Sequence, residues 1–236
     1  MTKRWSGPRV AVGAVIAAWA VLFWVLAFTD RTGLYLSART AWLVPMGAAL
    51  TTVAAIGRLA TARTTHEEHL GQRDRWMVAA VGLPVVLLLA MPPATLGTYA
   101  AGRRASFSGA GGLITPDDFE HGPLTMVHVA SAQTSEEDLA KLRARAGEEV
   151  TLQGFVVRQP DTPPDELLLT RFIVTCCVAD ATTAQVRVVN VPPGAFTDGD
   201  WLEITGRIYP IAREVVVAAD AVTSIPAPDS PYLTAF

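Results

Sequence analysis

The sequence predicts a membrane protein in two parts, an α-helical N-terminal part with three transmembrane helices and a small all-β domain, an OB-like five-stranded barrel. Every uncharged stretch of 18 residues or more lies before residue 103. The later residues form five short strand-like runs, separated by turns rich in Pro and Gly. We therefore expect a transmembrane domain over residues 1–102, a linker over 103–116 and a β domain over 117–236.

The three apolar runs of the N-terminal part are long enough to cross a bilayer. A helix needs about 20 apolar residues to span roughly 30 Å of hydrocarbon, and the runs contain 19, 18 and 27 uncharged residues. Tryptophans lie inside or at the ends of these runs, as they often do at membrane interfaces. The predicted helices cover about residues 10–28, 40–57 and 76–93.

The first apolar run also resembles a signal peptide, because Lys3, Arg4 and Arg9 precede it as a basic region. The apolar core of a signal peptide is usually about 7 to 15 residues long. This run is 19 residues long and has no clear cleavage site with small residues. Its length favours a retained membrane helix.

The basic residues of the short loops predict the orientation of the chain. The N-terminus and residues 58–75 contain seven Lys and Arg, whereas the loop between the first two helices contains two. Because basic loops stay in the cytoplasm, we expect a multi-pass cell-membrane protein with a cytoplasmic N-terminus and an extracytoplasmic β domain. Residues 103–236 carry a net charge of −8, against +5 for residues 1–102, which disfavours nucleic acid as a partner of this domain.

The segment after the Gly- and Ser-rich linker predicts a strand and then one short helix. Leu124–Ala130 is a short apolar run of strand type. Ser135 is a good N-cap, and the acids after it favour the first turn of a helix that ends near Ala146.

Five strands are expected after this helix. Apolar and polar residues alternate most clearly over residues 201–209, and Gly154 and Gly206 occupy positions where the strands of a small barrel bend. A small β-sandwich is the alternative, because the segment between the third and fourth strands is too short for the helix that many OB folds carry there. The expected strands cover residues 150–158, 167–179, 185–191, 201–209 and 214–222.

Four segments of the β domain resemble a known family. They are Gly154–Val156, Arg171–Ala181, Asp200–Gly206 and Ile225–Tyr232. In these segments the chain is similar to bacterial membrane proteins described as the small subunit of a two-gene permease. The resemblance is specific over residues 150–236 and only topological over the N-terminal third. It implies a partner, a larger polytopic permease-like membrane protein, more directly than it implies an activity.

The two cysteines of the chain, Cys176 and Cys177, are adjacent in a predicted strand, and Asp180 follows them. Alternation along a regular strand turns Cys176 toward the core with Phe172 and Val174, and turns Cys177 outward, so we expect Cys177 to be the more accessible thiol.

Three interpretations of the two cysteines stay open. A bulge brings both thiols to one side, where with Asp180 they form a site for zinc or another soft metal such as copper(I). The thiols form a strained, easily reduced disulfide. Cys176 is a small buried hydrophobe and Cys177 a surface thiol without a role.

Histidines offer further candidate ligands. His121 and His128 lie near the first predicted strand of the β domain, and either is a candidate metal ligand beside the cysteines or a base for Cys177 as a nucleophile. His66 and His69 are spaced as on one helical face and could bind a divalent ion, although histidines among loop charges are usually only solvated.

The missing motifs narrow the function. No predicted transmembrane segment contains an ionisable Asp, Glu, Lys, Arg or His, so the helices offer no polar transport path. The common nucleophile, phosphate-binding, zinc-protease and dinucleotide motifs are absent, and we expect no enzyme apart from thiol redox chemistry.

Two hypotheses remain. The first is a membrane-anchored accessory subunit of a permease, whose outer domain binds or delivers a small ligand such as a metal ion. Small residues at Gly13 and Ala17 offer it a helix face for the partner. The second is an extracytoplasmic thiol-redox protein that uses Cys176 and Cys177.

Overall fold

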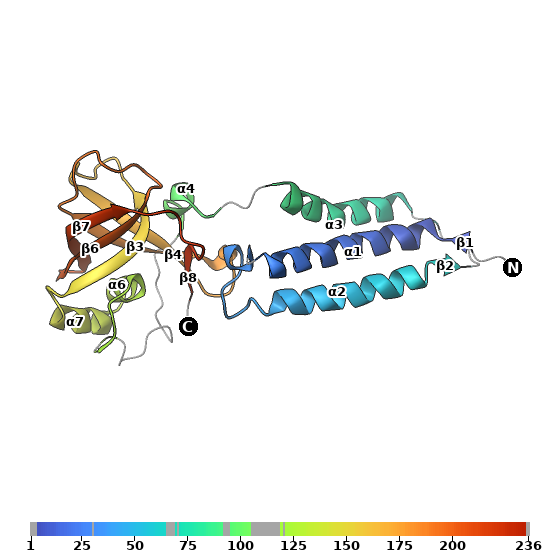
Figure 1. Cartoon of the computed structure of the whole chain (residues 1–236), viewed down its shortest axis with the longest axis horizontal. Helices are drawn as coiled ribbons and strands as arrows, with labels where there is room; N and C mark the ends of the chain where they lie inside the picture. Colours follow the sequence, from blue (N-terminus) through green and yellow to red (C-terminus); the bar gives the residue numbers. More distant parts are fainter. Residues whose placement is uncertain are drawn as a thin grey trace. The chain divides into compact units, whose positions relative to one another are not determined.

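The computed structural model describes residues 4–29, 31–64, 69, 71–91, 95–104, 119 and 121–234. The chain divides into two compact units, residues 1–94 and 95–236 (Figure 1). Residues 95–102, which were predicted to belong to the transmembrane domain, belong to the second unit. Most of the predicted linker, residues 105–116, lies outside the described residues.

The first unit is a group of three long helices. Helix α1 starts where the Ser6 hydroxyl accepts the Arg9 N–H at 3.5 Å and where a proline occupies the first turn. A two-residue antiparallel pair, β1 with β2, joins the start of α1 to the end of α2. The elements are β1 (Arg4–Trp5), α1 (Gly7–Phe28), the 3-10 helix η1 (Arg31–Leu34), α2 (Leu43–Ala60), β2 (Arg63–Thr64) and α3 (Gln72–Ala90).

Helices α1 and α2 pack through small residues. A Cβ on Gly13 would lie 2.7 Å from the Leu59 side chain, and Ala48 on α2 is fully buried. The Trp24 indole N–H donates to the Thr52 hydroxyl at 3.1 Å. The helix face at Gly13 was predicted to contact a partner protein. It instead contacts α2 of the same chain.

Two helices of the described residues, α1 and α2, are long and apolar enough to cross a membrane. The prediction of a third transmembrane helix, over about residues 76–93, was wrong. The segment is helical, but Arg73, Asp74 and Arg75 occupy its first turn, and the uncharged part from Trp76 to Ala90 has 15 residues. That is about 22 Å of helix, short of the roughly 30 Å hydrocarbon core.

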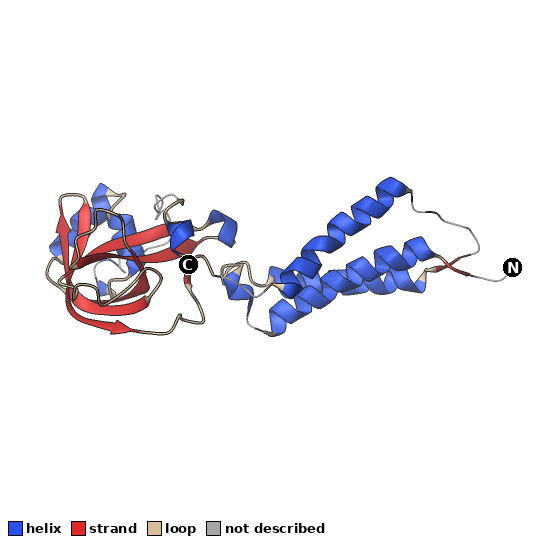
Figure 2. Ribbon diagram, turned by 90° about the horizontal axis from the view of Figure 1, so that it is seen from above, coloured by secondary structure: helices blue, strands red, loops and turns tan. Residues whose placement is uncertain are grey.

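The second unit contains a closed five-stranded barrel, as predicted (Figure 2). Strand β3 pairs with β4, β4 with β5, β7 with β6 and β6 with β3, all antiparallel, and the parallel pair of β5 with β7 completes the ring. This is a small barrel of OB type, and the closed ring excludes the β-sandwich alternative. The strands are β3 (Glu149–Val157), β4 (Glu166–Val174), β5 (Thr182–Val189), β6 (Trp201–Ile211) and β7 (Glu214–Ser224).

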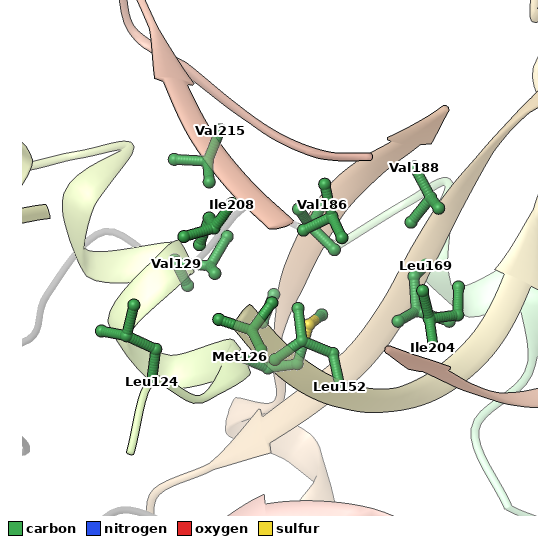
Figure 3. Close-up of a cluster of buried hydrophobic side chains, with 14 of the residues drawn as sticks. Leu124, Met126, Val129, Leu152, Leu169, Val186, Val188, Ile204, Ile208 and Val215 are labelled. Carbon is green, nitrogen blue, oxygen red and sulfur yellow. The ribbon is translucent and has the colours of Figure 1, made fainter. Parts of the chain in front are cut away.

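Two short helices, α6 (Met126–Ala132) and α7 (Glu136–Ala144), contribute to the barrel core. Met126 and Val129 of α6 lie with Leu152, Ile204 and other strand residues in the apolar cluster shown in Figure 3. The predicted strand at residues 124–130 was therefore wrong. A seven-residue apolar run does not separate a strand from a buried helix by its periodicity. Helix α7 forms where it was predicted, and the Ser135 hydroxyl accepts the Asp138 N–H at 3.3 Å.

A second apolar cluster covers the outer surface of β3 and β4. Helix α4 (Thr98–Ala101) and strand β8 (Tyr232–Thr234) supply residues to it. The Leu96 N–H donates to the Tyr232 hydroxyl at 2.9 Å, which ties the two ends of this unit together. Phe172 and Val174 lie in this outer cluster and Ile173 lies in the barrel core, the reverse of the predicted alternation.

Candidate functional site

The two cysteines lie in a turn between β4 and β5. Strand β4, which was predicted to run to residue 179, ends at Val174. Cys176 is exposed and Cys177 is partly buried, so the predicted order of accessibility was wrong. A short 3-10 helix, η2 (Val178–Asp180), follows the cysteines and leads into β5.

Asp180 explains why the strand ends early. Its carboxylate accepts the backbone N–H groups of Thr175 at 3.0 Å, Cys176 at 2.8 Å and Cys177 at 3.3 Å. Three consecutive N–H groups that point to one side chain cannot belong to a regular strand, whose N–H groups alternate in direction. The acid four residues after the first cysteine therefore builds the turn that presents both thiols.

Arg104 holds the other side of the turn. Its guanidinium donates to the Ala179 carbonyl at 3.1 Å and to the Ala181 carbonyl at 3.0 Å. Arg104 was not predicted as a site residue, because it stands at the start of the predicted linker, 75 residues before its first acceptor. Nothing in the local sequence pattern marks such a long-range contact.

The turn gathers three metal-binding side chains. The two Sγ atoms are 3.7 Å apart and are not joined by a disulfide. One ligand atom from each of Cys176, Cys177 and Asp180 lies within 4.8 Å of the other two. This is the one such group of three or more Cys, His, Asp or Glu side chains in the described part of the chain.

Electrostatics favour the protonated thiol of Cys176 and the ionised carboxyl group of Asp180. A hydrogen bond to Asp180 and a weaker one to Cys177 raise the pKa of the Cys176 thiol to about 12. Partial burial acts to raise the pKa of Asp180, but hydrogen bonds from the Cys176 thiol and from the three backbone N–H groups outweigh it and lower that pKa. Asp180 is therefore a carboxylate at neutral pH.

We expect Cys176 to be a slow nucleophile despite its exposure, because so little of it is thiolate near pH 8. In a Cys177→Ala background, Asp180→Asn should speed alkylation by iodoacetamide on the order of 100-fold, since the higher thiolate fraction outweighs the lower intrinsic nucleophilicity. Mass spectrometry of the labelled full chain measures the rate. Asp161→Asn in the same background is the matched control and should leave the rate unchanged; equal rates in the two variants would contradict this electrostatic account.

The predicted histidine ligands lie elsewhere or are not described. His128 is buried on α6, where its Nδ1 accepts the Thr125 N–H at 3.0 Å and so caps that helix. His121 is exposed, and neither histidine belongs to the group around the cysteines. His69 is exposed and lies outside every helix and strand, and His66 lies outside the described residues. Metal binding by these histidines stays a prediction.

Comparison with known proteins finds a family match for part of the chain and no activity. Residues 133–234 match the family described as the DUF1980 C-terminal domain, a description that names no function. The match covers helix α7, all five barrel strands, the cysteine turn and β8. No curated protein matches the chain.

Proposed function

We propose that this protein is a membrane-anchored accessory subunit of a permease, and that its barrel domain binds a soft metal ion through Cys176, Cys177 and Asp180 and passes it to the partner. The observation that carries the proposal is the turn itself. Two thiols and a carboxylate lie within 4.8 Å of one another in a surface turn of the barrel domain, where an ion can both enter and leave.

The spacing of the thiols suits zinc. Two thiolates bound at about 2.3 Å to a tetrahedral ion lie about 3.8 Å apart, and the two Sγ atoms of the turn are 3.7 Å apart. Three protein ligands leave one tetrahedral position for water or for a ligand from another protein, as in zinc sites that are not closed structural centres. Such a site suits transfer better than storage.

The carboxylate also has room for a metal. A carboxylate offers about four acceptor positions, and Asp180 uses them for three N–H groups and the Cys176 thiol. Metal binding requires that Cys176 lose its proton. Loss of that proton vacates the fourth position of Asp180 beside the ion while the backbone contacts that shape the turn remain.

A thiol-redox function is the second candidate, and the 3.7 Å distance between the sulfurs favours it. Oxidation would join the two sulfurs and pass two electrons and two protons to an external disulfide. The Cα atoms of adjacent residues are about 3.8 Å apart, closer than the usual 4.4 to 6.8 Å across a disulfide. The bond would therefore be strained and easily reduced.

Metal content and thiol state of the purified full chain separate the two candidates. The chain in detergent is equilibrated with zinc under reducing conditions, and bound zinc is measured by elemental analysis. The metal proposal predicts one zinc per chain, lost when both cysteines are blocked. A chain that takes up no zinc but forms a reversible bond between Cys176 and Cys177 would instead support the redox candidate.

The two helices that can cross a membrane predict the side on which the barrel lies. The basic residues around α1 and α2 favour a cytoplasmic N-terminus, and two crossings would return the chain to the cytoplasm, so the extracytoplasmic barrel expected from three crossings does not follow. We therefore expect a cytoplasm-only reporter to be active when fused after Phe236. Activity at the same position of alkaline phosphatase, which is active only outside the cytoplasm, would reverse the proposed orientation.

The partner is proposed to contact α2. Leu50, Val53 and Ile56 on this helix are each more than 60% exposed and form an apolar face. Because the helices themselves offer no polar path for transport, we assign this face to the partner that would provide one. A photo-crosslinking side chain at Val53 should capture a polytopic membrane protein in native membranes. The same side chain at Ala20, which is buried on α1, is the matched control; capture of no protein at Val53 would remove the support for a partner on this face.

A further inference from the structure

The helical unit contains an apolar cavity of about 260 Å³ that is open on one side. Its wall comes from α1, η1 and the residues after it, the start of α2 and the end of α3. A second cavity of about 380 Å³ adjoins it, shares Leu22, Leu26, Tyr35 and Leu88 with it, and reaches Arg31. The lining of the first cavity is Trp19, Leu22, Phe23, Leu26, Thr32, Tyr35, Leu36, Val44 and Leu88.

Arg31 and Tyr35 are the polar side chains that line the second cavity. Arg31 lies three residues beyond the last residue of α1 and lines the second cavity, and Tyr35 lines both. Within the part of the chain that the structure describes, neither the Arg31 guanidinium nor the Tyr35 hydroxyl has a recorded hydrogen bond or ion pair. A positive charge and a hydroxyl donor thus line a cavity that adjoins the apolar one.

We propose that this cavity binds a membrane phospholipid with an anionic head group. One acyl chain fills the apolar cavity, and the phosphate lies against Arg31 and Tyr35. The residues just past a membrane helix lie at the depth of the lipid head groups, and an arginine pairs well with a phosphate. A soluble ligand would gain nothing from the exposed apolar surfaces that surround the opening, whereas a lipid reaches it directly from the bilayer.

This inference rests on the membrane location in the proposed function, and bilayer discs test the two separately. Discs of equal parts phosphatidylglycerol and phosphatidylcholine are prepared with bromine in the chains of one lipid or the other, because bromine quenches nearby tryptophan. Trp19 lines the cavity, and a Trp19→Phe variant identifies its share of the signal. We expect brominated phosphatidylglycerol to quench Trp19 more than brominated phosphatidylcholine does.

Arg31→Gln should remove this preference, because one basic side chain near a lipid surface accounts for about a fivefold change in affinity. Arg39→Gln removes the same charge from an exposed residue of the same loop that lines neither cavity, and it should keep the preference. Equal quenching by the two lipids would assign the cavity to unspecific lipid or to a partner helix and overturn the inference. A helical unit that enters neither kind of disc would instead overturn the membrane location itself.

Discussion

Cys176→Ser is expected to weaken zinc binding at least about 100-fold, because even loss of a residue behind a metal ligand costs 10- to 100-fold in affinity. Serine keeps the size of the side chain but does not supply a thiolate, so the ion would keep one thiolate, Cys177, and one carboxylate, Asp180. Competition with a chromophoric chelator measures the affinity of the full chain in detergent.

The two cysteine variants need a matched control at a residue that lies away from the proposed metal site. Asp161→Asn alters an exposed residue of the β3–β4 loop and should bind zinc as the unsubstituted chain does. Cys177→Ser should weaken zinc binding to the same extent as Cys176→Ser. If both serine variants keep the original affinity, the ion binds elsewhere and the proposed centre is wrong.

Gly206→Ala is expected to destabilise the barrel by about 1–3 kcal/mol or more, as overpacking of a closed structure does. A Cβ at this position would lie 2.3 Å from the Ala218 carbonyl oxygen and 3.0 Å from the Ala219 Cα. Both are backbone atoms of β7, and the pairing of β6 with β7 shifts register between Thr205 and Gly206. The backbone of one strand would therefore have to move away from the other.

Calorimetry of the purified chain measures this cost. A loss of 1 kcal/mol lowers the midpoint of thermal unfolding by about 2 to 4 °C in a domain of about 150 residues, and this unit spans residues 95–236. Gly97→Ala, where a Cβ meets no atom within 4 Å, is the matched control in the same unit and should change the midpoint little. Equal midpoints for the two variants would mean that β6 and β7 do not approach as closely as described.

The barrel could be predicted from the sequence because its strands have local signals. Residues 201–209 alternate strictly, and the turns between strands carry Pro and Gly. Helix α7 was predictable for the same reason, since Ser135 and the acids after it form a local N-terminal pattern. Helix α6 was not, because its short apolar run is buried on nearly every side and so shows no periodicity.

The cysteine turn was only half predictable. The residue types of Cys176, Cys177 and Asp180 indicated soft-metal chemistry, but a strand was assumed to continue through them. Asp180 ends that strand through three backbone contacts, and a carboxylate four residues away gives no periodic signal. The contact from Arg104 joins residues 75 positions apart, and only the folded chain brings them together.

X-ray absorption at the zinc edge of the zinc-loaded full chain tests the metal centre most directly. Two sulfur atoms at about 2.3 Å and oxygen or nitrogen atoms at about 2.0 to 2.2 Å are expected around the ion. The sulfur signal should fall by half in Cys176→Ser. A zinc ion surrounded by oxygen and nitrogen alone would contradict the proposal that Cys176 and Cys177 hold the metal.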